Sequence, residues 1–123
     1  MFALGTSRRF QLYNHPTDMR KSFDSLRGLV INDLDQNPDN GTVYIFINKV
    51  RNKAKLLHWQ SGGFMLYYKR LESGTFELPA YDMEIGSLHL SYAQLILLID
   101  GIAITNITRR KRLSLAMVLW IGI

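Results

Sequence analysis

The sequence predicts an α+β fold: a small single domain in which an antiparallel β meander of four to five strands packs with an N-terminal and a C-terminal helix. Short runs of β-branched and aromatic residues follow one another between residues 42 and 79, separated by turn signals. An amphipathic stretch precedes these runs and a second apolar stretch follows them. With 123 residues and 47% hydrophobic content, the chain can bury one core without disulfide bonds or metal.

The N-terminal part predicts a strand and then a helix. Residues 8–16 alternate briefly between apolar and polar and end at Pro16, which favours extended backbone in the residue before it. Apolar residues then recur at spacings of three and four through residues 17–34, which predicts an amphipathic helix with Thr17 or Asp18 as its N-cap. These apolar residues are Met19, Phe23, Leu26, Val30 and Leu34.

The middle of the chain predicts the meander. Asn40-Gly41, Ser61-Gly62-Gly63 and Ser73-Gly74 are turn signals. The segments that they and a basic stretch separate are rich in residues that favour strands. The predicted strands are TVYIFI (42–47), AKLLHW (54–59), FMLYYKRL (64–71) and TFELP (75–79).

The C-terminal part predicts a helix and then a tail. Residues 87–90 are either a short strand or the lead into a helix that Ser91 caps and that ends at Gly101. We expect one domain over residues 1–108. Residues 109–123 are a basic cluster followed by an apolar run too short to cross a bilayer, and they predict a last buried strand or a membrane-surface tail.

Positive charge is concentrated in the middle third of the chain. Residues 41–71 contain six lysines and arginines and no acid. Lys49, Arg51, Lys53 and Lys55 are spaced by two, so an extended backbone would place all four on one face, whereas a hairpin loop would spread them into solvent. A positive field of this kind attracts polyanions.

The stretch FMLYYKRL has two interpretations. In a strand, Phe64, Leu66, Tyr68 and Arg70 share one face, and the residues between them share the other. The tyrosine rings could cover the edge of the core while Lys69 and Arg70 reach solvent. Alternatively, Tyr67, Tyr68 and Trp59 could stack on bases or contact phosphates beside the basic residues.

Signatures of known catalytic classes are absent from the sequence. No cysteine occurs, which excludes a disulfide framework and a thiolate zinc site. The three histidines are isolated, and no nucleotide-binding glycine loop is present, so we expect no metal and no cofactor. A remote alternative is a metal-independent ribonuclease with His58 or Tyr68 as base and Arg70 stabilising phosphate charge.

Several stretches together resemble one family. They are HPTDMRKSFDSLRGLV, NPDNGTVYIFINK, KLLHWQSGGFMLYYKRLESGTFELP and LSYAQLILLIDGI, within residues 9–102. They are similar to the TnpB accessory proteins of bacterial insertion sequences of class sixty-six, the second-reading-frame-like family. The resemblance implies a protein required beside a separate transposase, and it supplies no catalytic residues. Arg20 and Lys21, which match the motif, are unfavourable in a first helical turn, so a phosphate or acidic partner would explain them better.

We therefore expect a non-catalytic accessory protein for transposition that acts in the cytoplasm, where it binds DNA at the element ends and cooperates with the transposase. The alternative is an adaptor that docks an acidic region of the transposase without nucleic acid. We expect no small-molecule substrate and no membrane partner. The oligomeric state is open. The candidate nucleic-acid-binding residues are Arg20, Lys21, Arg51, Lys53, Lys55, Trp59, Tyr67, Tyr68, Lys69 and Arg70.

Overall fold

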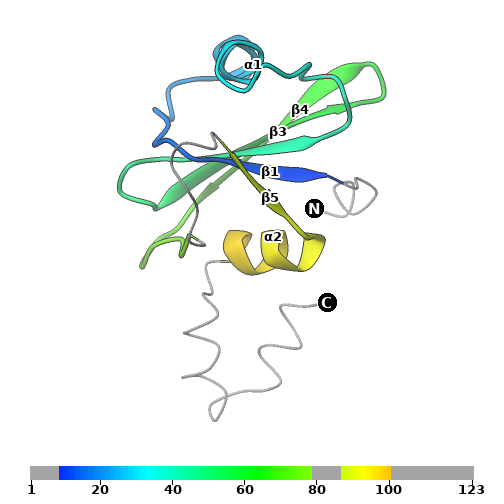
Figure 1. Cartoon of the computed structure of the whole chain (residues 1–123). Coiled ribbons are helices and arrows are strands. Elements are labelled where there is room, and N and C mark those ends of the chain that lie inside the picture. Colours follow the sequence, from blue (N-terminus) through cyan, green and yellow to red (C-terminus); the bar gives the residue numbers. More distant parts are fainter. Residues whose placement is uncertain (1–8, 79–86, 101–123) are drawn as a thin grey trace.

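A computed structural model describes residues 9–78 and 87–100. Five strands form one sheet in the order β4-β3-β2-β1-β5, and one helix packs on each side of it (Figure 1). The elements are β1 (Phe10–Tyr13), α1 (Phe23–Asn32), β2 (Val43–Ile47), β3 (Lys53–Gln60), β4 (Gly63–Arg70), β5 (Ser87–Leu90) and α2 (Tyr92–Ile99).

The predicted α+β class is confirmed, and the sheet proves to be mixed. β2, β3 and β4 form the expected antiparallel meander, and β5 pairs antiparallel with β1. β1 and β2 are parallel, because the chain leaves β1, passes through α1 and returns to the same end of the sheet before β2 starts. A parallel pair needs such a crossover, whereas the other connections within the meander are short hairpins.

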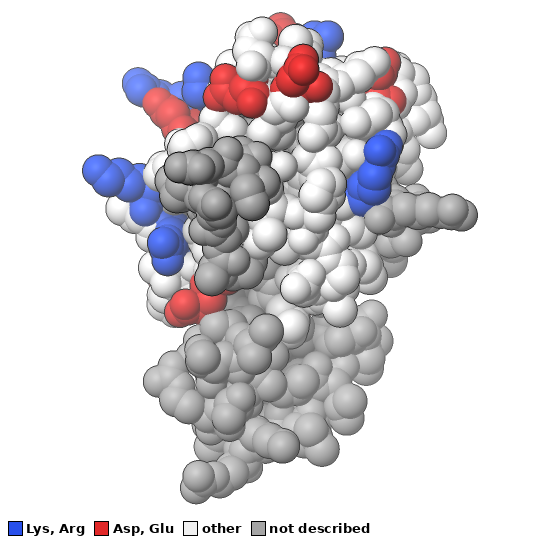
Figure 2. All heavy atoms as spheres, in the orientation of Figure 1, with Lys and Arg blue, Asp and Glu red and all other residues white. Residues whose placement is uncertain are grey.

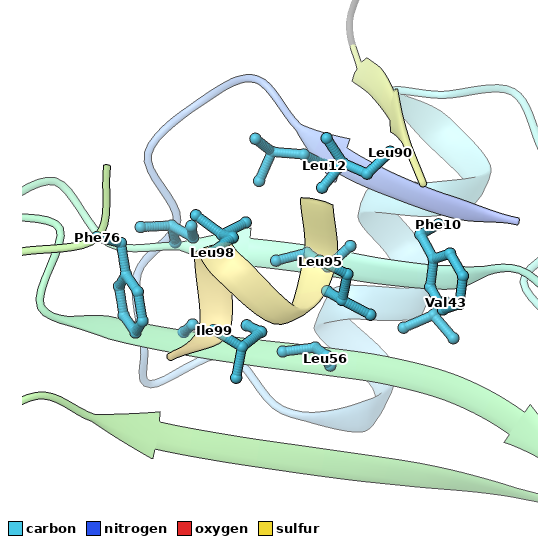
Figure 3. Close-up of a cluster of buried hydrophobic side chains, with 12 residues drawn as sticks. Phe10, Leu12, Val43, Leu56, Phe76, Leu90, Leu95, Leu98 and Ile99 are labelled. Carbon is cyan, nitrogen blue, oxygen red and sulfur yellow. The ribbon is translucent and has the colours of Figure 1, made fainter. Parts of the chain in front are cut away.

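Alternation along the strands divides the core between the two faces of the sheet. On one face, α2 buries Leu95, Leu98 and Ile99 against β1, β2 and β3 (Figure 3). On the other face, α1 buries Leu26 and Val30. β2 contributes fully buried side chains to both faces, which explains its unbroken apolar sequence VYIFI.

The N-terminal helix is shorter than the predicted span of residues 17–34. Its N-cap is Ser22, whose N–H donates to Ser25 Oγ at 3.1 Å. Asp18 instead forms a turn, because its Oδ1 accepts the Arg20 N–H at 2.9 Å and its carbonyl accepts the Lys21 N–H at 3.1 Å. Aspartate competes with the helix in this way through its short side chain. The helix therefore begins one turn later than the apolar spacing indicates.

The predicted strand at residues 75–79 is wrong for residues 75–78, the part that the structure describes. Phe76 is fully buried in the core on the α2 face, which accounts for its apolar signal. Its N–H donates to the Arg51 carbonyl at 2.6 Å, and this bond ties the segment to the loop between β2 and β3. The predicted tail, residues 109–123, lies outside the described residues.

β1 (Phe10–Tyr13) is shorter than the predicted stretch of residues 8–16, whereas the boundaries around β4, β5 and α2 agree closely with the structure. Ser91 caps α2 by accepting the Gln94 N–H at 3.1 Å, and residues 87–90 form the strand β5. Ser61 and Gly62 connect β3 to β4 with φ values of 53° and 82°, the left-handed pair that a two-residue hairpin turn requires. Neither helix in the described part of the chain is long and apolar enough to span a bilayer.

Candidate nucleic-acid interface

A groove of about 640 Å³ lies between the loop that leads into α1 and the loop that joins β2 to β3. We call it the basic groove. Three cations and one acid line it, together with one tyrosine ring. In Figure 2, lysine and arginine side chains are prominent along the left edge of the molecule, where Figure 1 shows these two loops. The lining residues are Pro16, Thr17, Asp18, Met19, Arg20, Asn48, Lys49, Val50, Lys53 and Tyr68.

The loop from Asn48 to Asn52 is held by its own side chains. Asn48 Oδ1 accepts the N–H groups of Asn52 and Lys53, each at 3.0 Å, and Asn48 Nδ2 donates to Asn52 Oδ1 at 2.7 Å. Arg51 has a φ of 61°, the left-handed conformation that closes the turn. Lys49 and Arg51 therefore project from a fixed hairpin end before β3, which corresponds to the hairpin-loop alternative rather than to four cations on one strand.

Arg20 and Asp18 form an ion pair at the edge of the basic groove. Arg20 donates from Nε and Nη2 to the two carboxylate oxygens, with a shortest distance of 2.6 Å. The hydrogen bonds from Arg20 lower the pKa of Asp18 to about 2, and the pair raises the pKa of Arg20. The guanidinium side chain nevertheless remains 91% exposed, so its unpaired N–H groups face solvent.

Lys55 lies inside the protein and is only 7% exposed. Its ammonium donates to the carbonyl oxygens of Met19 at 2.7 Å and Lys21 at 2.6 Å, and it lies 4.9 Å from the centre of the Tyr68 ring. A buried ammonium requires such partners. Lys55 thus fastens the loop before α1 to the sheet, and its donors are not available to a phosphate.

The α1 face of β3 and β4 carries the exposed part of the predicted interface. Lys53 and Arg70 are directly opposite each other, and so are Lys55 and Tyr68. Tyr68 is 54% exposed at the wall of the basic groove. Arg70 forms a 3.2 Å ion pair with Glu72 on the surface. These positions bring Lys53, Tyr68 and Arg70 together as a single surface.

Tyr67 and Lys69 lie on the opposite face of β4. Tyr67 packs against the core on the α2 side. Lys69 lies 3.8 Å from Asp100 at the end of α2. Burial raises the pKa of Asp100, and Lys69 partly offsets this effect. The structure therefore separates Tyr67 and Lys69 from the basic groove, as strand alternation requires.

Trp59 is on the α1 face but belongs to the far end of β3, six residues from Lys53 and about 20 Å away along the strand. The centres of its ring and the Phe64 ring are 4.9 Å apart, and the two rings meet edge-on.

Lys21 is half-buried and outside the lining of the basic groove. Lys49, by contrast, lines the basic groove although it was not among the candidate residues. Its position in the run of cations spaced by two could have identified it from the sequence.

Of the two bases in the ribonuclease alternative, His58 lies apart from Arg70, whereas Tyr68 shares the face of Arg70. His58 is buried on the α2 face of β3, and burial lowers its pKa. Tyr68 and Arg70 belong to the opposite face of the neighbouring strand. Among the described residues, no cluster of three histidine or acidic side chains could hold a metal ion.

Comparison with known proteins gives one family and two relatives. The family model described as "IS66 Orf2 like protein" matches residues 8–109. The uncharacterized protein y4jC of Sinorhizobium fredii is 31% identical over 109 residues, which cover 87% of this chain and 92% of that protein. The uncharacterized protein y4hO of the same organism is 35% identical over 103 residues, covering 83% and 87%. No solved structure matches. The chain therefore belongs to the IS66 Orf2-like family, a membership that indicates an accessory role in the transposition of an insertion sequence.

Proposed function

We propose that this chain is a non-catalytic accessory protein of transposition that binds DNA through the basic groove and acts beside a separate transposase in the cytoplasm. The observation that supports this most directly is the convergence of Arg20, Lys49 and Lys53 around the exposed ring of Tyr68. Arg51 and Arg70 extend the positive surface beside it.

The chemistry of this surface fits the phosphate backbone of DNA. Lysine and arginine side chains neutralise phosphates and release bound counterions, which provides affinity with little choice of sequence. The groove contains Asp18 as well, but this acid is already paired with Arg20. Sequence choice would then come from the transposase or from DNA shape.

The number of exposed cations sets a quantitative expectation. Three to five phosphate contacts predict a slope of log K against log salt between about −2.7 and −4.5, since each contact contributes about 0.9. Lys55 is excluded from this count because its ammonium is bound to backbone carbonyls.

Fluorescence anisotropy across a salt series tests the proposal, with a terminal inverted repeat of the element and a scrambled duplex as ligands. We expect salt-sensitive binding to both duplexes, and a slope smaller by about 1.8 for the double variant Lys49→Ala/Lys53→Ala. A matched control removes the same charge elsewhere, for example Arg9→Ala/Lys69→Ala, and should retain the wild-type slope.

Absence of binding to either duplex near physiological salt would overturn the DNA-binding proposal. Capture of the purified transposase in the same buffer, lost on substitution of Lys49 and Lys53, would then identify the basic groove as the docking site of an adaptor. An adaptor of this kind needs its protein partner and gives no anisotropy change with DNA alone.

A further inference from the structure

A second groove, of about 500 Å³, lies at the other end of α1. We call it the acidic groove. Its apolar part is formed by Ile31, which is 46% exposed, and by the paired rings of Trp59 and Phe64. Asp35 and Asp39 also line it, and both are exposed. The groove therefore presents two anions beside an aromatic surface, together with one cation, Arg27, which is paired with Asp24 outside the groove at 3.4 Å.

The walls of the acidic groove are held in place. On one side, the Arg27 guanidinium lies 5.3 Å from the centre of the Phe64 ring. On the other side, Gln36 exchanges two hydrogen bonds with Gln11, at 2.9 and 3.0 Å, and accepts the Tyr44 hydroxyl at 2.8 Å. The segment that carries Asp35 and Asp39 is thus anchored to β1 and β2, and a ligand would meet a surface that is already formed.

The end of the β2–β3 loop has the complementary pattern. Val50 is 63% exposed, the most exposed of the large hydrophobic side chains in the described residues, and it lies between Lys49 and Arg51. The Asn48 hydrogen bonds described above fix this tip. The tip thus offers two cations beside an exposed apolar side chain, and the acidic groove offers Asp35 and Asp39 beside the apolar surface of Ile31, Trp59 and Phe64.

The tip and the acidic groove lie at opposite ends of α1. The tip adjoins the basic groove beside the residues that precede the helix, whereas the acidic groove is lined by residues at and beyond its last turn. The helix has 10 residues and spans about 15 Å. Because the tip and the groove are both fixed to one sheet, the tip cannot enter the groove of its own chain.

We propose that the acidic groove receives the Lys49-Val50-Arg51 tip of a second copy of this chain. The contact joins two different surfaces, so it is head-to-tail, and repetition generates rings or open arrays. Complementary charges orient such contacts and exclude other partners. Since Lys49 also lines the basic groove, a polyanion bound there competes with the acidic groove of a neighbouring copy for the same cation.

Sedimentation velocity of the purified full chain over a concentration series, at low and at high salt, tests this contact. Two variants reverse one side each: Lys49→Glu/Arg51→Asp changes the tip, and Asp35→Asn/Asp39→Lys changes the groove. Asp and Asn are chosen at residues 51 and 35 because both positions have positive φ, which these residues tolerate. Circular dichroism verifies that each variant is folded.

We expect wild type to associate at low salt and each variant alone to associate at least about tenfold more weakly. An equimolar mixture of the two should regain association, because the unaltered tip of the groove variant fits the unaltered acidic groove of the tip variant, and the charge-reversed tip faces the charge-reversed groove in the other pairing. The control Glu72→Gln/Glu77→Lys has the same charge change as the groove variant and should associate like wild type. A monomeric wild type, a groove variant that associates normally, or a mixture that gains nothing would overturn the proposal.

Discussion

The ammonium of Lys55 lies 4.9 Å from the centre of the Tyr68 ring while it donates to the Lys21 carbonyl at 2.6 Å. One buried cation therefore connects the loop before α1 to the tyrosine that walls the basic groove. Its charge contributes to the local field, but its donors are used within the fold. The groove depends on Lys55 for its shape and on Arg20, Lys49 and Lys53 for contact with a ligand.

Replacing Lys55 by methionine should lower the free energy of unfolding by about 2–4 kcal/mol, because two charge-assisted hydrogen bonds are lost and two backbone carbonyls lose their partner. Urea unfolding followed by circular dichroism measures the change. Lys53→Met is the matched control on the same face of β3, and we expect it to cost less than about 0.5 kcal/mol. Equal losses for the two variants would contradict the structural role assigned to Lys55.

Arg70→Ala and Lys69→Ala should have different effects on DNA binding, although the residues are neighbours in sequence. Arg70 shares the face of Lys53, and losing one phosphate contact should weaken binding about fivefold to tenfold at moderate salt. Lys69 lies on the α2 face beside Asp100, so its removal should leave affinity within about twofold. Anisotropy titrations with one duplex compare them. A larger loss of affinity for Lys69→Ala would indicate that DNA contacts the α2 face of β4 and would contradict the proposed interface.

Arg51→Gly separates backbone conformation from charge. Arg51 occupies the left-handed region at a φ of 61°, which costs a residue with a Cβ about 1 kcal/mol relative to glycine. We expect the free energy of unfolding to stay level or rise by up to about 1 kcal/mol, while DNA affinity and the salt slope both decrease. Thermal unfolding and anisotropy measure the two effects. A marked loss of stability would show that the Arg51 side chain itself supports the loop.

The ion pair between Asp18 and Arg20 predicts a pH dependence at the acidic end. The pKa of Asp18 is lowered from 3.8 to about 2 in the folded protein. A lowered carboxyl pKa stabilises the folded state above the ordinary value, and this contribution disappears as the pH falls through the folded value. Thermal unfolding of wild type and Asp18→Asn should therefore differ by a constant amount from pH 7 to about 5, and the difference should shrink between about pH 4 and 2. A difference that does not change across this range would exclude the ion pair as its source.

Much of the fold could be predicted because local signals and tertiary structure agree. The turn at Ser61 and Gly62, the cap at Ser91 and the alternation along β4 each depend on nearby residues, and all three are present. The start of α1 could not be read from apolar spacing, since the preceding backbone is turned by Asp18 and is also held by Lys55, 34 or more residues away from Met19 and Lys21. The parallel pairing of β1 with β2 is likewise a long-range choice that strand patterns do not encode.

The sequence indicated which residues contribute to the candidate site better than it indicated how these residues are arranged. Charge density indicated the region from Lys49 to Arg70, and Lys49 and Lys53 of this region line the basic groove. It could not distinguish Lys53, which lines the groove, from Lys55, which is buried two residues later on the same face. A lysine can extend into solvent or fold back onto carbonyls, and the choice depends on the loop that packs above it. The separation of Trp59 from the basic groove follows from its position along β3 rather than from its face.

The position of α2 at the end of the described chain affects the order in which the protein can fold during synthesis. The apolar centre of one face of the sheet, including Phe10, Leu12 and Val43, is packed against Leu95, Leu98 and Ile99. A nascent chain that has exposed only the first 78 residues to solvent therefore has a complete α1 face and an uncovered apolar face. Chains that terminate before Ile99 should expose that face permanently, which makes them targets for aggregation and degradation. We therefore expect the folded protein to accumulate only from chains that include the second helix.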